Sequence, residues 1–273
     1  MKFKKLAVIG AEVSGVDLCG PLSNATIAEI RAGLVEHSLL VFRDQPLTGD
    51  QLLDLGRAFG ELFIQPVFKD LFKELLILEN DEKRPPVLNT FHQDMTGLKE
   101  PPAEHLLHAL EIPEGGGDTI WSSNFAAFES LSKSMQQFLL GLTASHSIEH
   151  AYGRTGGLDR MPNGAEIRAR LRRDHPATSH PVVRTHPHSG RKGLFVNKFF
   201  TEKIDGLTAG ESAALLRYLY EVIETPEFCC RLRWEVGTLA IWDNRCTSHY
   251  AVADYYPKRR KMQRASVCGE VPV

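Results

Sequence analysis

Short segments with the pattern of buried strands recur along the chain. They lie at 39–42, 75–78, 103–110, 119–122, 181–185 and 193–196, with three or four more between 228 and 267. Segments of this length, bounded by Gly, Pro, Asp or Asn, are typical of strands buried inside a protein. The helical segments do not alternate with them regularly, which argues against a parallel βαβ fold. We therefore predict a mainly β fold with helices, built on a double-stranded β-helix, that is, a cupin-like jelly roll.

Helical spacing of apolar residues marks four further segments. One begins at Ser23 or Asn24, and a second begins at Thr48 and ends at Gly60. The other two cover 125–142 and 207–224. Residues 149–180 contain many Arg, Gly, Asp and Pro but few large apolar residues, so we expect a mobile lid or a solvated excursion with one short helix there. No repeat or linker interrupts the pattern, and we predict a single domain over 1–273.

Composition excludes several classes of partner. Hydrophobic residues make up 42% of the chain and charged residues 24%, which is ordinary for a soluble globular protein. The formal net charge of −2 gives no reason to expect a nucleic acid, and no run of about 18 apolar residues suggests a membrane span. The five cysteines are odd in number and include no C-x-x-C pair, so we expect reduced thiols and a cytoplasmic protein.

The tripeptide His92-Gln93-Asp94 is a candidate for part of a metal site. In an extended chain, side chains at i and i+2 point to the same face, so His92 and Asp94 would converge. An imidazole and a carboxylate on one face make two thirds of the 2-His-1-carboxylate set that holds non-haem Fe(II). The motif is also common by chance, and it therefore requires a second, distant histidine.

His249 is the strongest candidate for that histidine. It lies on a predicted strand that returns after the turn at Asp243-Asn244. The other histidines that we weighed fit ordinary structural positions, because their spacing or a nearby turn does not favour chelation. These are His105, His108, His146, His150, His186 and His188.

Two arginines near the end of the chain could bind carboxylates. Arg260 and Arg264 are four residues apart, and on a strand they share a face with Met262 between them. A guanidinium binds both oxygens of a carboxylate and keeps its charge when desolvated. The alternative is a solvated basic edge, which Lys258, Arg259 and Lys261 would extend.

Taken together, these motifs resemble the Fe(II)- and 2-oxoglutarate-dependent dioxygenases of the taurine dioxygenase and chlorophenoxyacetate dioxygenase family. The resemblance runs from about Val13 to the C-terminus. Its motifs are VFRDQ (41–45), FGEL (59–62), HQD (92–94), GGDT (116–119), HPVVRTH (180–186), IWDNR (241–245) and the arginines at 260 and 264. The resemblance implies an enzyme that uses O2 and converts 2-oxoglutarate to succinate and CO2 as it hydroxylates a substrate.

It also implies the metal ligands. The catalytic Fe(II) ligands of the family correspond to His92, Asp94 and His249. Three protein ligands leave three octahedral positions open, two for 2-oxoglutarate and one for O2. Related iron halogenases lack the carboxylate, so Asp94 favours hydroxylation over halogenation.

The co-substrate and substrate contacts follow in the same way. Thr119 and Arg260 correspond to the groups that hold 2-oxoglutarate, and Arg264 corresponds to an arginine that meets the anionic group of the substrate. The family resemblance further implies a homo-oligomer, a dimer or a tetramer.

The taurine-binding pocket of the family is not retained. Gln65 stands where taurine enzymes have a histidine, Phe68 where they have a tyrosine and Leu88 where they have an asparagine. Tyr152 and Phe200 correspond to aromatic pocket positions. A pocket that has lost hydrogen-bonding groups loses discrimination for a small polar substrate. We therefore expect a small organic anion with an aryl or alkyl body, namely an aryloxyalkanoate, an alkyl sulfate or a sulfonate without an amino group.

Two alternatives remain open from the sequence. The same cofactors could support desaturation or cyclisation of a metabolite, because the pose of the substrate decides the outcome. A non-catalytic jelly-roll protein that binds a small acid, with or without zinc, is the second alternative.

Overall fold

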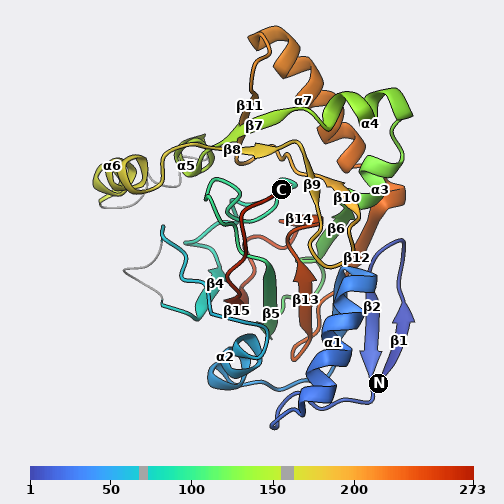
Figure 1. The fold of residues 1–273 in the computed structure, drawn as a ribbon. Coiled ribbons are helices and arrows are strands. Elements are labelled where there is room, and N and C mark those ends of the chain that lie inside the picture. The colour runs from blue at the N-terminus through green and yellow to red at the C-terminus, as the bar shows by residue number, and fades with distance from the viewer. Residues whose placement is uncertain (68–72, 155–162) are drawn as a thin grey trace.

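A seven-stranded sheet forms the largest layer of the protein. The computed structural model describes residues 1–67, 73–154 and 163–273. The sheet order is β1-β2-β3-β13-β5-β15-β4 (Figure 1), and every neighbouring pair is antiparallel except β2 and β3. Its strands are β1 (Lys2–Lys5), β2 (Ala11–Ser14), β3 (Leu39–Phe42), β4 (Leu76–Asn80), β5 (Glu104–Glu111), β13 (Leu239–Asp243) and β15 (Arg260–Ser266). Strands from both ends of the chain therefore meet in the middle of one sheet.

A smaller sheet faces the large one across an aromatic core. It contains β12 (Cys229–Leu232), β6 (Thr119–Ser123) and β14 (Thr247–Ala251), in that order. Trp121 on β6 packs edge-on against Trp242 on β13, with ring centroids 5.6 Å apart, and both side chains are buried. The two facing sheets confirm the predicted jelly-roll core.

Strand β3 shows why its apolar run is continuous. Leu39 and Val41 pack into the core between the sheets, in the same cluster as Trp121. Leu40 and Phe42 point the other way and pack with residues of two helices, α1 (Asn24–His37) and α2 (Gly49–Arg57). A strand covered on both faces needs apolar residues at every position.

The helix starts predicted at Ser23 and Thr48 are correct, but the end of the second helix is wrong and one predicted helix is two. Ser23 caps α1, and Thr48 forms a capping box at the start of α2. Helix α2 ends at Arg57 rather than Gly60, because tighter turn hydrogen bonds replace the helical pattern there. The predicted segment 125–142 is two helices, α3 (Asn124–Glu129) and α4 (Lys133–Leu139), because Ser132 caps a new helix. The remaining long helix is α7 (Ala209–Ile223).

The described residues of segment 149–180 form more helix than we predicted. It contains two helices, α5 (Ile148–Arg154) and α6 (Gly164–Asp174), where one was predicted, and residues 155–162 lie outside the described residues. Ile167 and Leu171 lie one helical turn apart and pack with Ile148 and Phe199, so two apolar residues suffice to dock α6. The nearby sheets contain β7 (Thr143–His146), β8 (Thr178–Pro181), β9 (Val183–Thr185), β10 (Lys192–Leu194) and β11 (Thr201–Ile204), and a short 3₁₀ helix, η1, covers Pro226–Phe228.

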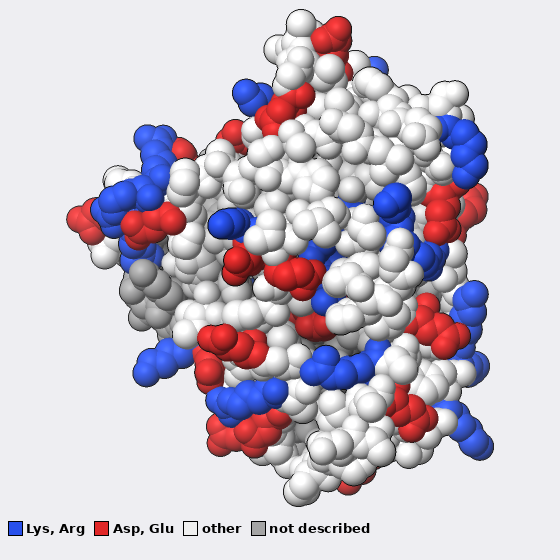
Figure 2. Space-filling view, viewed as in Figure 1, with Lys and Arg blue, Asp and Glu red and all other residues white. Residues whose placement is uncertain are grey.

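The surface and the cysteines agree with the composition. Lys and Arg alternate with Asp and Glu over the face in Figure 2, without a continuous basic stripe. Within 1–67, 73–154 and 163–273, no helix is both long enough and apolar enough to cross a bilayer. All five cysteines are free thiols.

The capping box of α2 gives a test of the fold. Thr48→Ala removes the hydroxyl that accepts from the Gln51 backbone N–H, so we expect the free energy of unfolding to fall by about 1 kcal/mol. Urea denaturation measures the change. The control is Ser134→Ala, at an exposed position within α4, which we expect to stay within about 0.5 kcal/mol of wild type. Equal stabilities for Thr48→Ala and wild type would contradict the assignment.

Candidate metal and co-substrate site

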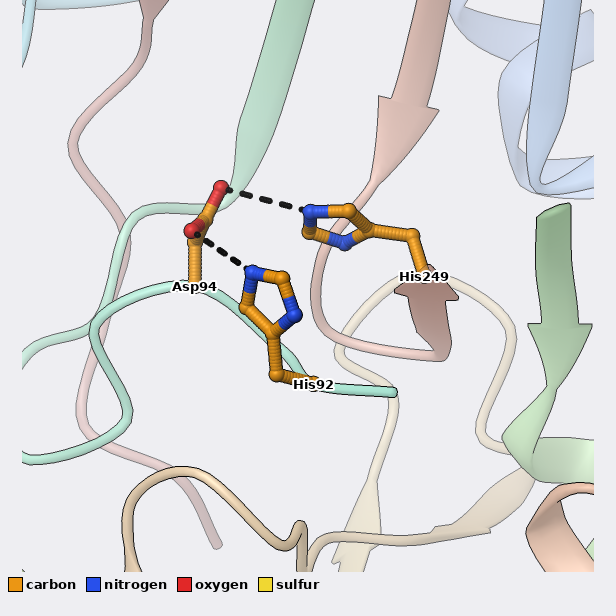
Figure 3. Close-up of side chains that lie close together, drawn as sticks. All are labelled: His92, Asp94 and His249. Atoms are coloured by element: carbon orange, nitrogen blue, oxygen red, sulfur yellow. Dashed lines mark ion pairs between the residues drawn. The ribbon is translucent and has the colours of Figure 1, made fainter. Parts of the chain in front are cut away.

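His92, Asp94 and His249 converge on one buried point. His92 Nε2 lies 3.6 Å from Asp94 Oδ1, and His249 Nε2 lies 3.9 Å from Asp94 Oδ2 (Figure 3). One ligand atom from each residue lies within 4.8 Å of the others, and all three side chains are buried. Two imidazoles and one carboxylate at this separation match the donor set that holds Fe(II) in oxygenases. The residues present therefore fit the metal that the family resemblance implies.

Backbone pairing explains how residues so distant in sequence meet. The N–H of His92 donates to the carbonyl of His249 at 3.0 Å, and the N–H of His249 donates back at 2.8 Å. The loop that contains His92 thus extends the small sheet beside β14. Because each imidazole is attached to a paired backbone, the two rings stay together, with centroids 4.2 Å apart.

Asn244 fixes the backbone of Asp94. Its Oδ1 accepts from the N–H of Asp94 at 2.8 Å, and its Nδ2 donates to the carbonyls of Asp94 and Pro102 at 3.0 and 2.9 Å. Sequence reasoning identified Asn244 only as a turn residue. Asn244 is part of the IWDNR motif, but that motif does not indicate which backbone Asn244 binds, and Asp94 lies 150 residues away.

The orientation of the His92 ring is also set. Its Nδ1 lies 2.8 Å from the carbonyl oxygen of Thr90, which can only accept, so Nδ1 carries the proton and Nε2 keeps a free lone pair. His249 Nδ1 is buried and has no hydrogen-bond partner among the residues described. Burial and the nearby His92 ring hold the pKa of His249 well below its usual range, so its imidazole is neutral and able to bind a metal.

The charge of Asp94 is compensated mainly by Arg264. Burial alone would raise the pKa of Asp94, but the Arg264 guanidinium and the neighbouring imidazoles hold it well below its usual range. Arg264 Nη1 donates to Asp94 Oδ2 at 2.8 Å, while Arg264 Nε is buried and has no hydrogen-bond partner in the described part of the chain. The predicted anion-binding arginine therefore lies directly beside the predicted metal ligands.

Arg260 and Thr119 lie against the same indole. Trp234 Nε1 donates to Thr119 Oγ1 at 3.0 Å, and the Arg260 guanidinium carbon lies 6.0 Å from the centroid of the Trp234 ring. Arg260 Nε donates to the carbonyl of Gly117 at 3.1 Å, and its terminal nitrogens make no ion pair in the described residues. A desolvated guanidinium with free donors beside a hydroxyl fits a carboxylate of 2-oxoglutarate.

Strand β15 presents these arginines to the interior and not to solvent. Arg260, Met262 and Arg264 are all buried and alternate with residues on the other face, as predicted. On that other face, Gln263 Nε2 donates to the carbonyl of Leu47 at 3.0 Å and contacts His108. The alternative of a solvated basic edge is therefore wrong for Arg260 and Arg264.

The predicted substrate residues lie around one aromatic group. Gln65 Nε2 donates to the Tyr152 hydroxyl at 3.2 Å, and Tyr152 packs against Phe200 at 6.4 Å between centroids. Leu88 is partly buried in the same cluster, and Phe200 is buried in it. Gln65 and Arg264 also line one small cavity. Phe68 lies outside the described residues.

His105 is the residue that sequence reasoning missed. It was assigned an ordinary structural position, but its Nε2 lies 3.4 Å from Asp94 Oδ2. Burial lowers the pKa of His105 to about 3, so the ring is neutral at neutral pH. Only the position of β5 beside β15 brings this side chain to Asp94, and no local motif reports that pairing.

A second group of possible ligands is a polar network instead of a metal site. His186 Nε2, an Asp243 oxygen and Cys246 Sγ lie close together and are buried. Asp243, however, already binds Arg245 through both oxygens and His186 Nε2 at 2.9 Å. The other ring nitrogen of His186 bonds to Ser189, which leaves no free set of donors.

Comparison with known proteins identifies the family. The model of the taurine catabolism dioxygenase TauD, TfdA family matches residues 2–266. The chain belongs to this family. It is 35% identical to an alkylsulfatase of Acinetobacter baylyi, over 96% of this chain and 83% of that protein. It is 34% identical to an alpha-ketoglutarate-dependent sulfate ester dioxygenase of Pseudomonas putida, over 97% and 88%.

A solved structure extends the likeness to three dimensions. The crystal structure of AAD-2 in complex with Mn(II) and N-oxalylglycine superposes with a TM-score of 0.85 at 27% identity, covering 99% of this chain and 98% of that one. The family and the fold therefore agree with the jelly roll and with a 2-oxoglutarate-dependent oxygenase.

The Asn244 contacts give a test of the site. Asn244→Ala leaves the buried N–H of Asp94 and two carbonyls without a partner, so we expect the free energy of unfolding to fall by about 1–3 kcal/mol. Divalent metal affinity should also fall, because the Asp94 backbone is no longer held. Urea denaturation and Co(II) titration measure both effects. The control is Asn89→Ala, at an exposed position in the loop that contains Asp94. Wild-type values for Asn244→Ala would refute the role of Asn244.

Proposed function

We propose that this protein is an Fe(II)- and 2-oxoglutarate-dependent dioxygenase that hydroxylates a small organic anion. One observation carries the proposal: Arg264, a buried cation whose Nε has no hydrogen-bond partner among the described residues, lies 2.8 Å from the carboxylate of the His92, Asp94 and His249 cluster. An anion bound by that arginine would be held next to the metal. This proximity fits oxidation of an anionic substrate better than simple storage of an acid.

His92, Asp94 and His249 would hold the Fe(II). When bound, Fe(II) supplies the O2-activating chemistry of this class, in which 2-oxoglutarate gives succinate and CO2 and the substrate gains a hydroxyl group. The protein keeps His92 Nε2 free as a ligand atom through the Thr90 carbonyl and keeps Asp94 ionised through Arg264. Placement and exclusion of water are the tasks of the chain.

Thr119 and Arg260 would bind the far carboxylate of 2-oxoglutarate. Both are buried, and both contact Trp234, so they form one rigid receptor for two oxygens. Fixing that carboxylate orients the keto acid toward the metal ligands. N-oxalylglycine, bound in the similar AAD-2 structure, has the same two carboxylates, which supports this use of the pocket.

Arg264 would bind the anionic group of the substrate, and an apolar wall would contact its body. Leu88, Tyr152 and Phe200 supply this wall, and Gln65 adds one amide. An alkyl sulfate is the favoured substrate class, because both relatives compared above act on sulfate esters by name. Aryloxyalkanoates and sulfonates are the next candidates.

The chemistry of a sulfate ester fits hydroxylation. A hydroxyl added to the carbon that bears the sulfate oxygen gives an unstable adduct. Its C–O bond to sulfate breaks as the hydroxyl proton leaves, and the products are an aldehyde and inorganic sulfate. Release of free sulfate is therefore a direct readout of the proposed reaction.

Domain organisation, oligomeric state and location also belong to the proposal. Residues 1–273 form one dioxygenase domain, and α5, within segment 149–180, lies beside the pocket, since the Tyr152 hydroxyl accepts a hydrogen bond from Gln65. The protein works as a dimer or tetramer, which the family resemblance supports. It works in the cytoplasm, which its free cysteines support. Light scattering on the purified protein tests the oligomeric state.

Removal of a metal ligand tests the reaction. His92→Ala and Asp94→Ala should lower Fe(II)-dependent succinate formation by a factor of at least about 100, because each variant loses one of the three metal ligands and so weakens metal binding and opens an extra coordination position. Succinate is measured by chromatography after anaerobic loading with Fe(II). Asn89→Ala should keep wild-type turnover. Full turnover in either ligand variant would refute the site.

A panel of anions tests the substrate class. We expect kcat/KM for hexyl sulfate to exceed that for taurine at least about tenfold, because the pocket lacks the polar partners of an ammonium group. Phenoxyacetate and hexanesulfonate complete the panel, and succinate and sulfate are measured in parallel. A preference for taurine would contradict the proposal.

A further inference from the structure

His105 faces the metal carboxylate from strand β5. Its backbone pairs with Ser266 on β15, and its side chain is 1% exposed. The ring packs against Trp242, with centroids 5.0 Å apart. Nε2 lies 3.4 Å from Asp94 Oδ2 and makes no hydrogen bond within the described part of the chain. A buried ring nitrogen without a partner, aimed at a carboxylate, calls for an explanation.

The partner of the other ring nitrogen allows either neutral tautomer. Nδ1 of His105 lies 2.7 Å from Ser266 Oγ, and a hydroxyl can donate or accept there. If Nδ1 carried the proton, the lone pair of Nε2 would face the Asp94 carboxylate, which is repulsive. If Ser266 donates to Nδ1, the proton sits on Nε2, the ring nitrogen that lies 3.4 Å from Asp94 Oδ2. Electrostatics therefore select the Nε2–H form of the neutral ring.

In this tautomer two donors, Arg264 Nη1 and His105 Nε2, lie near Asp94 Oδ2 and not near Oδ1. Arg264 Nη1 lies 2.8 Å from Oδ2 and His105 Nε2 lies 3.4 Å from the same oxygen. Of the two ligand imidazoles, His92 Nε2 lies 3.6 Å from Oδ1 and His249 Nε2 lies 3.9 Å from Oδ2. Donors on one oxygen limit rotation of the carboxyl group and leave the other oxygen free to bind a cation.

We propose that His105 is a positioning residue for the metal carboxylate, which holds Asp94 Oδ2 through Nε2–H so that Oδ1 binds the metal. This inference rests on the proposed metal site. It assigns a role to a histidine that lies outside the three ligands and acts only through Asp94. Ser266 supports this arrangement, because its hydroxyl can donate to Nδ1 and so accommodates the Nε2–H tautomer of His105.

His108 shows that a buried histidine on β5 need not have this role. It lies three residues further along the strand, on the opposite face, and is also buried. Its Nε2 bonds to the carbonyl of Gln45 at 2.7 Å and its Nδ1 lies 3.0 Å from Gln263 Nε2. Both nitrogens are satisfied far from Asp94, so His108 is a matched control.

The tautomer can be measured directly in the metal-free protein. Histidine labelled with ¹⁵N gives long-range ¹⁵N–¹H spectra that distinguish the two neutral forms, and loss of a signal in His105→Gln assigns the ring. We expect the Nε2–H tautomer for His105 at neutral pH. An Nδ1–H form, or a ring protonated at both nitrogens, would overturn the proposal.

Metal affinity provides the second test, with Co(II) as the probe and its visible absorption as the readout. His105→Asn removes the donor to Asp94 and should weaken Co(II) binding about tenfold. His105→Gln places an N–H close to the position of Nε2 and should restore most of the affinity. His108→Gln should stay within about twofold of wild type. Wild-type affinity in His105→Asn, or no recovery in His105→Gln, would overturn the proposal.

Asp94→Ala separates this inference from the proposed function. If Asp94→Ala leaves the Co(II) spectrum unchanged, the metal does not bind at the three ligands and the proposed function fails. If Asp94→Ala abolishes the spectrum while His105→Asn binds as wild type does, only the role of His105 fails. Circular dichroism confirms that each variant is folded, and the ¹⁵N measurement decides the question if His105→Asn is not.

Discussion

A buried carboxylate is the constraint on which the site depends. Asp94 is buried, and an unpaired charge in a protein interior would be costly. Arg264 compensates the charge of Asp94, and Asn244 holds the backbone of Asp94 in place. These partners come from β15 and from the turn after β13. The ionised state of one side chain therefore requires that two distant strands be correctly placed.

A second buried polar network helps to align the strands of the large sheet. Arg245, directly after Asn244, binds Asp243 and Glu104, and Glu104 precedes His105 on β5. Burial raises the pKa of Glu104 to about 7, with Arg245 opposing the rise. Buried ion pairs of this kind contribute little net stability, but an incorrect pairing would leave a charge without a partner. The network therefore favours one alignment of β5 with β13.

Local patterns predicted much of this arrangement. The strand segments were recognisable because their apolar runs are covered on both faces, and His92 and Asp94 were recognisable because i and i+2 share a face. The arginines of β15 followed from the same alternation. Partners set by strand pairing were not predictable in this way: Asn244 and His105 reach Asp94 only after β5, β13 and β15 have assembled. The second helix in segment 149–180 escaped notice because Ile167 and Leu171 are its few apolar contacts within a charged sequence.

Strand β15 has functionally different side chains on its two faces. Its inward row holds Arg260 and Arg264, and its outward row holds Gln263, which is tied to Leu47 beside α2. A slip by one residue would exchange the rows, bury an amide among tryptophans and turn both guanidinium groups toward α2. Misalignment would thus be penalised as a folding error before any catalytic defect could arise. The positions of the two arginines proposed to bind anions therefore depend on the same strand pairing that stabilises the sheet.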